Sequence, residues 1–118
     1  MDEIKEVKAT EFFMKCWKDL GMKDRQFNNL KDYLLENKNY LLGDVIQGLG
    51  ARKMRWKLNN NKGKSHGQRI IYIVYESHGI LYLLFTYAKS KQENLTEEQK
   101  KTFKRLIDTI DKALNNKT

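Results

Sequence analysis

The apolar residues of this 118-residue chain change their spacing at Gly43. Upstream of Gly43 they recur every three or four positions, as on one face of a helix. Downstream they alternate, or form short runs rich in β-branched and aromatic residues, which is typical of strands. A chain of this length buries enough surface for one core, so the pattern predicts a single α+β domain over residues 1–118.

Two helices are predicted before Gly43. Apolar residues at helical spacing in the first are Phe12, Phe13, Cys16 and Trp17. Thr10 is a suitable N-cap for this helix and Gly21 a suitable stop after it. The second helix is expected over residues 24–37. The two form a helical hairpin whose apolar stripes need a partner surface, and a short strand is expected around residues 4–7.

The strand predicted over residues 52–58 has an apolar face and a cationic face, because alternate side chains of a strand point to opposite sides. The apolar face carries Met54, Trp56 and Leu58. The cationic face carries Lys53, Arg55 and Lys57. We therefore expect a half-buried strand with Trp56 in the core.

The rest of the chain predicts a hairpin and a final helix. Strands over residues 68–76 and 80–88 are hydrophobic almost throughout, which indicates central strands joined by a short turn. Thr96 to Gln99 then read as a capping box ahead of an apolar stripe from Phe103 to Leu114. The expected fold is an N-terminal helical hairpin packed on a small, curved, mainly antiparallel sheet, with a C-terminal amphipathic helix.

Residues 45–75 contain no acidic residue and seven basic ones. These are Arg52, Lys53, Arg55, Lys57, Lys62, Lys64 and Arg69. Of the 23 basic residues in the chain, the other 16 are nearly balanced by 15 acidic ones, so this segment accounts for almost all of the net charge of +8. Such a concentration favours a polyanionic partner, RNA above all.

Several other classes of protein are disfavoured by the sequence. The single cysteine excludes an internal disulfide, and neither an export signal nor an apolar run of membrane-spanning length is present, so a cytoplasmic location is expected. His66, His78 and Cys16 are scattered, so neither a metal nor another cofactor is predicted. Gly63-Lys64-Ser65 lacks the first glycine of a phosphate-binding loop, because that position is Leu58.

The basic segment suits RNA chemistry that needs no metal. Cleavage requires activation of the 2′-OH, stabilisation of charge on phosphorus and a proton for the leaving 5′-oxygen. Arginine binds phosphate oxygens with a fixed fork of donors, and lysine among other cations can move a proton. The candidate catalytic residues are Lys53, Arg55 and Arg69. Additional RNA contacts are expected from Arg52, Lys57, Lys62, Lys64 and His66.

Structural interpretations compete with this one. A basic strand face more often binds than catalyses, and His66 in an Asn- and Gly-rich loop is either a solvated residue or a proton shuttle. Tyrosines within strands pack in cores more often than they stack on bases. Those with ring faces that a base of single-stranded RNA could use are Tyr72, Tyr75, Tyr82 and Tyr87.

Five segments, taken in order, resemble a known family. They are GDVIQG (43–48), GARKMRW (50–56), GQRIIY (67–72), YLLFTYAK (82–89) and NLT (94–96). In this combination the chain, over about residues 10–114, resembles RelE/HigB-type toxins of bacterial type II toxin–antitoxin systems. The Tyr-Ala-Lys at 87–89 favours the HigB-like branch.

This resemblance implies a metal-independent endoribonuclease that enters the ribosomal A site and cuts translated mRNA. It also implies a cognate antitoxin, expected to be a small helix-turn-helix protein. Proton transfer is assigned to Lys53, and phosphate binding to Arg55 and Arg69. Further RNA contacts implied by the end of the last strand are Tyr87, Lys89 and Lys91.

The chain also departs from the family pattern. No tyrosine stands in residues 89–96, where RelE has an arginine-rich segment and then a tyrosine, so no general acid or base is assigned. The glycine-rich segment before Arg52 is shortened to residues 48–51. Two alternatives to catalysis therefore stay open: a non-catalytic module of the same fold that blocks translation by occupying the ribosome, and an interaction protein whose basic face meets an acidic partner.

Overall fold

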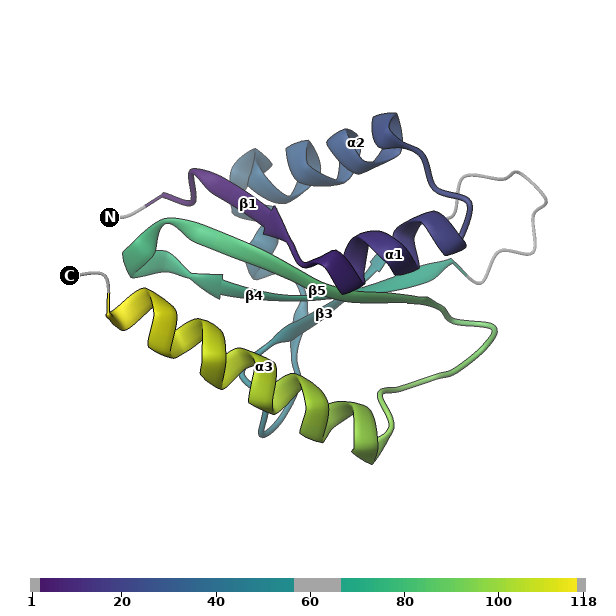
Figure 1. Cartoon of the computed structure of the whole chain (residues 1–118). Helices are drawn as coiled ribbons and strands as arrows, with labels where there is room; N and C mark the ends of the chain where they lie inside the picture. Colours follow the sequence, from purple (N-terminus) through teal and green to yellow (C-terminus); the bar gives the residue numbers. More distant parts are fainter. Residues whose placement is uncertain (1–2, 57–66, 117–118) are drawn as a thin grey trace.

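The computed structural model describes residues 3–56 and 67–116, in which helices cover both faces of a mixed sheet (Figure 1). The helices are α1 (Glu11–Asp19), α2 (Asp24–Leu35) and α3 (Glu97–Asn115), with short 3₁₀ helices η1 (Glu36–Leu41) and η2 (Glu76–His78). The strands are β1 (Glu6–Ala9), β2 (Asp44–Val45), β3 (Arg52–Trp56), β4 (Gln68–Tyr75) and β5 (Ile80–Ala88). The expected contacts of Lys57, Leu58, Lys62, Lys64 and His66 lie outside the described residues.

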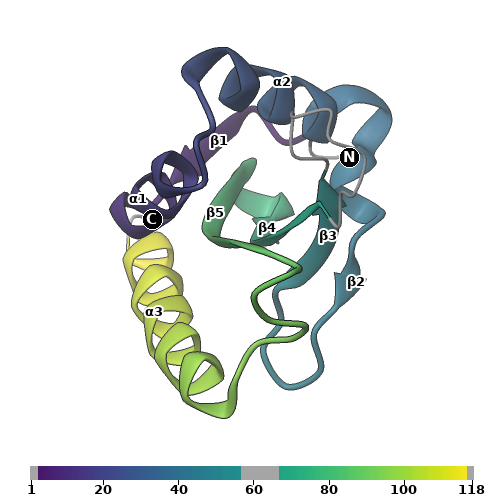
Figure 2. The same ribbon diagram turned by 90° about the vertical axis from the view of Figure 1, so that its right-hand side faces the viewer.

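The sheet has the strand order β1-β5-β4-β3-β2 and is antiparallel except where β1 pairs with β5. The hairpin of β4 and β5 is therefore central, as predicted. One face of the sheet packs against α1 and α2, and we call it the α1/α2 face; the other packs against α3, and we call it the α3 face (Figure 2). The predicted α+β fold is confirmed.

Local signals place both ends of α1 and the start of α3. The Thr10 hydroxyl accepts a hydrogen bond from the Phe13 N–H at 3.0 Å, and Gly21 has the positive φ of +81° that ends a helix. The Thr96–Gln99 capping box forms as predicted, with Gln99 N–H donating to Thr96 Oγ1 at 3.0 Å. The N-caps at Thr10 and Thr96 satisfy backbone donors that the start of a helix leaves unpaired.

Two predicted elements differ by two residues from their expected bounds, and β4 ends one residue early, at Tyr75. The second helix was expected to reach Asn37, but α2 ends at Leu35, because Asn37 and Lys38 adopt left-handed φ angles of 52° and 56°. Asparagine tolerates this conformation better than most residues. The strand expected over residues 4–7 is shifted to Glu6–Ala9, while Ile4 itself is buried in the core.

The short strand β2 was not predicted, and Gly43 explains how it is held. The Tyr72 hydroxyl donates to the Tyr40 carbonyl at 2.8 Å and accepts from the Gly43 N–H at 3.2 Å. A Cβ on Gly43 would collide with that hydroxyl. Glycine is therefore required here by the close approach of the Tyr72 side chain, and the contact places Asp44 opposite Lys53 of β3.

Two hydrophobic clusters sit on opposite faces of the sheet. On the α1/α2 face, Phe13 and Trp17 pack with Ile70 and Tyr72 of β4. On the α3 face the packed residues include Ile71, Ile73, Leu84, Phe85, Phe103 and Ile107. The pairing of β4 with β5 shifts between Ile71 and Tyr72, so Leu84 forms a bulge and joins Phe85 on the α3 face.

Strand β3 is half-buried, with the two faces that alternation predicted. Met54 and Trp56 pack against the α1/α2 cluster. Trp56, expected in the core, is only partly buried, and its ring lies 5.4 Å from that of Tyr33. It sits near the margin because β3 has only the two-residue β2 on its outer side.

Candidate nucleic-acid interface

Two predicted arginines lie directly opposite each other on the α3 face. Arg55 of β3 pairs in register with Arg69 of β4, and Arg69 pairs with Tyr87 of β5. Residues opposite one another in an antiparallel pair project to the same side of the sheet. The three side chains thus form one row across three strands.

The arginines of this row differ sharply in exposure. Arg55 is exposed, whereas only 8% of Arg69 reaches solvent. Within residues 3–56 and 67–116, neither guanidinium forms an ion pair with a carboxylate, and Arg69 Nη1 is buried without a hydrogen-bond partner. Like charges placed opposite each other on a sheet oppose folding, and a buried unpaired donor adds to that cost.

Tyr87, the third residue of the row, is buried, so its ring face is not open to solvent. Only 6% of the residue is exposed, and its ring packs 5.3 Å from that of Phe85. Burial raises the pKa of Tyr87, with the Arg69 charge acting in the opposite direction. The hydroxyl is therefore a proton-bearing group at neutral pH, and the ring has little surface on which a base could stack.

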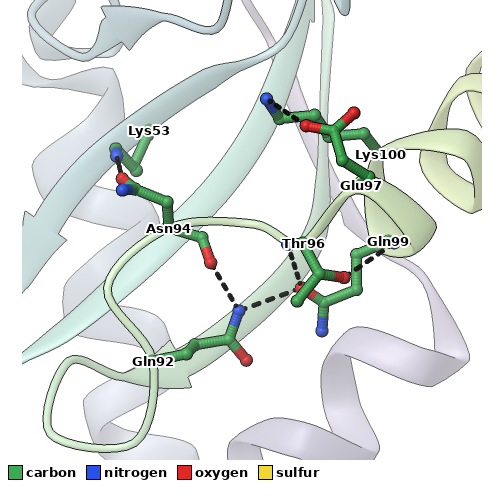
Figure 3. A network of polar contacts seen from close by, with 7 residues as sticks. All are labelled: Lys53, Gln92, Asn94, Thr96, Glu97, Gln99 and Lys100. Atoms are coloured by element: carbon green, nitrogen blue, oxygen red, sulfur yellow. Dashed lines mark hydrogen bonds and ion pairs between the residues drawn. The ribbon is translucent and has the colours of Figure 1, made fainter.

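Lys53 projects on the same face, one row along from Arg55. Its ammonium donates a hydrogen bond to Asn94 Oδ1 at 3.0 Å (Figure 3). A cavity of about 430 Å³ opens beside this contact. It is lined by Asp44, Val45, Ile46, Lys53, Asn94, Leu95, Glu97 and Lys100.

Two carboxylates line this cavity, although the basic segment contains none. Asp44 immediately precedes that segment and is the register partner of Lys53 in the β2–β3 pair. Glu97 comes from the first turn of α3 and lies 3.6 Å from the Lys100 ammonium. Neither carboxylate is predicted at the site from the sequence, because the two-residue β2 and the approach of α3 to Lys53 leave no periodic signal.

Arg52 does not join the other cations. It lies on the opposite face of β3 from Lys53 and Arg55, and its Nη1 donates to the carbonyls of Leu41 at 3.1 Å and Gly43 at 2.8 Å. This guanidinium is engaged in holding the η1–β2 connection. Alternation along β3 predicts this difference, because Arg52 is two residues from Met54 and therefore projects to the same side of the strand as Met54.

The lysines after β5 extend from the end of the sheet where the arginine row lies. The Lys89 N–H donates to the Gly67 carbonyl at 3.1 Å, which places Lys89 beside the start of β4. Its ammonium lies 3.7 Å from a Glu93 carboxylate oxygen, in a partly exposed pair, and Lys91 is exposed.

Among the described residues, no group of three or more His, Cys, Asp or Glu side chains is placed to hold a metal ion. None of the described helices is both long and apolar enough to span a membrane. What the interface offers is a guanidinium pair, an ammonium held by an amide, and a protonated phenol. These groups bind phosphate oxygens and stabilise negative charge that develops on them.

Comparison with known proteins places the fold. No protein-family model matches this sequence. Among solved structures, the chain is similar to the E. coli toxin RelE in the free state, in a form with two arginines replaced by alanine. The TM-score is 0.51 at 15% identity, over 79% of this chain and 90% of that one. The arrangement of helices on a five-stranded mixed sheet is thus the fold of the RelE toxin.

Proposed function

We propose that this protein is the toxin of a type II toxin–antitoxin system, acting as a metal-independent, ribosome-dependent mRNA endoribonuclease. The observation that carries the proposal is the Arg55–Arg69 pair, which opposes two like charges on a RelE-type sheet without a carboxylate partner among the described residues. Such an arrangement opposes folding in the free protein and is offset when an anion binds. A phosphate of RNA is the anion that fits a two-pronged donor.

In the proposed reaction, the RNA 2′-oxygen attacks the adjacent phosphorus and the bond to the 5′-oxygen breaks. The products are a 2′,3′-cyclic phosphate and a 5′-OH end. Exposed Arg55 binds a phosphate oxygen directly, and Arg69 supplies a second positive charge from its buried position beside it. The 2′-OH loses a proton and the leaving 5′-oxygen gains one, and Lys53, on the same face, takes part in this proton transfer.

The remaining candidate residues are proposed to bind the RNA backbone rather than the reacting phosphate. They are Lys57, Lys62, Lys64, His66, Lys89 and Lys91. Contacts of this kind steer an anionic partner and weaken as salt concentration rises. We further propose a HigB-like toxin that acts in the cytoplasm, as a single domain, on mRNA in the ribosomal A site and is blocked by a helix-turn-helix antitoxin.

A second candidate function is arrest by occupancy without cleavage. It is favoured by the missing tyrosine in residues 89–96 and by the burial of Tyr87, which together leave no exposed phenol at the end of β5. The same cationic face would then hold the message or the ribosome without breaking a bond. Mapping 5′ ends on a translated message separates the two functions, because occupancy creates stalled ribosomes but no new ends.

Induced expression tests the proposal in cells. The parent should stop translation, and Arg55→Ala with Arg69→Ala should relieve the arrest. Arg25→Ala is a matched control, because Arg25 is exposed on α2, on the other side of the sheet. A double variant as toxic as the parent would show that the arginine row does not carry the activity.

A further inference from the structure

The connection between β5 and α3 is held by a chain of polar contacts (Figure 3). Gln92 Nε2 donates to the Asn94 carbonyl at 2.9 Å and to Gln99 Oε1 at 2.9 Å. Gln99 Oε1 also accepts from the Thr96 N–H at 3.0 Å, within the capping box of α3. The backbone of Asn94 is thus tied to the first turn of a helix.

The residue after Asn94 anchors the same segment in the core. Leu95 is only 7% exposed and belongs to the cluster that contains Phe103 of α3. Asn94 itself is exposed and immediately precedes this buried anchor, which is followed by the helix cap at Thr96. With its neighbours fixed in this way, the exposed Asn94 side chain starts from a defined backbone position, which is one condition for orienting another group.

From that position the Asn94 side chain contacts Lys53, which is 41 residues away in the sequence. A lysine side chain has several rotatable bonds and loses conformational entropy when it is ordered. Acceptance of one N–H by Asn94 Oδ1 offsets part of this cost before RNA binds. The amide is neutral, so it holds the ammonium without adding a negative charge, and this contact uses only one of the three ammonium donors.

We propose that Asn94 is the positioning residue for Lys53, and that the β5–α3 connection sets where the ammonium stands relative to the arginine row. This inference rests on the role in proton transfer proposed for Lys53. A carboxylate in place of the amide would hold the ammonium equally well but would repel RNA phosphate. Asparagine combines a fixed acceptor with no charge.

The test compares Asn94→Ala and Asn94→Asp, with Ser90→Ala as control because Ser90 is exposed in the same connection. Single-turnover cleavage of a message on ribosomes is followed over a range of toxin concentrations. For Asn94→Ala we expect the plateau rate to fall about tenfold, with the half-saturating concentration changed less than about twofold. For Asn94→Asp we expect the plateau rate to stay within about threefold of the parent and the half-saturating concentration to rise by at least about threefold.

A second measurement reads the contact without relying on cleavage. The ¹⁵N resonance of Lys53 Nζ, assigned with Lys53→Arg, should shift in Asn94→Ala and stay in place in Ser90→Ala. An unmoved resonance, or a plateau rate for Asn94→Ala equal to that of the control, would overturn the inference. If the parent cuts no message at all, the proposed function fails, while the resonance still shows whether Asn94 holds Lys53.

Discussion

The two faces of the sheet use arginines in opposite ways, and β3 shows both uses within one short strand. On the α1/α2 face, Arg52 donates to two backbone carbonyls and holds the η1–β2 connection. On the α3 face, Arg55 lies opposite Arg69 with no carboxylate partner among the described residues. Arg52, whose donors are paired with backbone carbonyls, stabilises the fold, whereas the Arg55–Arg69 pair is available for an anionic ligand.

Arg69→Met should have the largest effect, because it should lower message cleavage without lowering the free energy of unfolding. The substitution keeps an apolar stem of similar length but removes the buried charge beside Arg55. We expect message cleavage to fall about 10²–10³-fold, while the free energy of unfolding stays equal to that of the parent or rises by about 1 kcal/mol. Cleavage kinetics and urea unfolding measure the two quantities, and Arg25→Ala serves as the control.

The reverse result for Arg69→Met, with cleavage retained and stability lost, would make Arg69 a structural cation. The claim that arginines of the α3 face serve a ligand rather than the fold would then be wrong.

Gly43→Ala tests the packing that holds β2 in place. The new Cβ meets the Tyr72 hydroxyl, so we expect a loss of about 1–3 kcal/mol in the free energy of unfolding. Tyr72→Phe removes that hydroxyl and makes room for the methyl group. The double variant should therefore lose less stability than the sum of the two single variants. If the losses of the two single variants added strictly in urea unfolding, the new Cβ would not collide with the Tyr72 hydroxyl.

Arg52→Ala and Arg55→Ala compare two arginines on opposite faces of one strand. Arg52→Ala removes hydrogen bonds from a charged donor to two carbonyls, so the free energy of unfolding should fall by about 1–2 kcal/mol. Arg55→Ala removes an exposed side chain and should change it by no more than about 0.5 kcal/mol. Equal losses in thermal or urea unfolding would mean that Arg52 and Arg55 have the same structural role.

Tyr72→Phe should lower the free energy of unfolding by about 1 kcal/mol below pH 10. Burial raises the pKa of Tyr72 from 10 to about 12. Since the protonated form is favoured in the folded state, this stabilisation is complete below pH 10 and is lost as pH rises from 10 to 12. The variant should therefore show a shallower decline in unfolding free energy across that window, and an unchanged slope would contradict the buried hydroxyl.

Much of the fold was predictable because its signals are local. Thr10, Gly21 and the Thr96–Gln99 box place helix ends, and the runs of β4 and β5 are long enough for their period to be read. The two-residue β2 has no period, so it could not be predicted. The premature end of α2 depends on φ angles at Asn37 and Lys38, which spacing does not reveal.

The candidate site was less predictable, because its partners are distant in sequence. Alternation along β3 predicted that Lys53 and Arg55 share a face. The contact of Lys53 with Asn94 joins residues 41 apart, and the burial of Tyr87 depends on packing within the α3 cluster. Asp44 was passed over because it stands one residue before the acid-free segment, although strand pairing brings it opposite Lys53.

The most direct test of the account is to map 5′ ends on a message in a reconstituted translation system, with and without ribosomes. The parent and Arg25→Ala should create new 5′-OH ends within the codon in the ribosomal A site, and only when ribosomes are present. The variant that combines Arg55→Ala with Arg69→Ala should create none. Stalled ribosomes without new ends, or equal cleavage by the double variant, would contradict an arginine row that acts on the RNA phosphate.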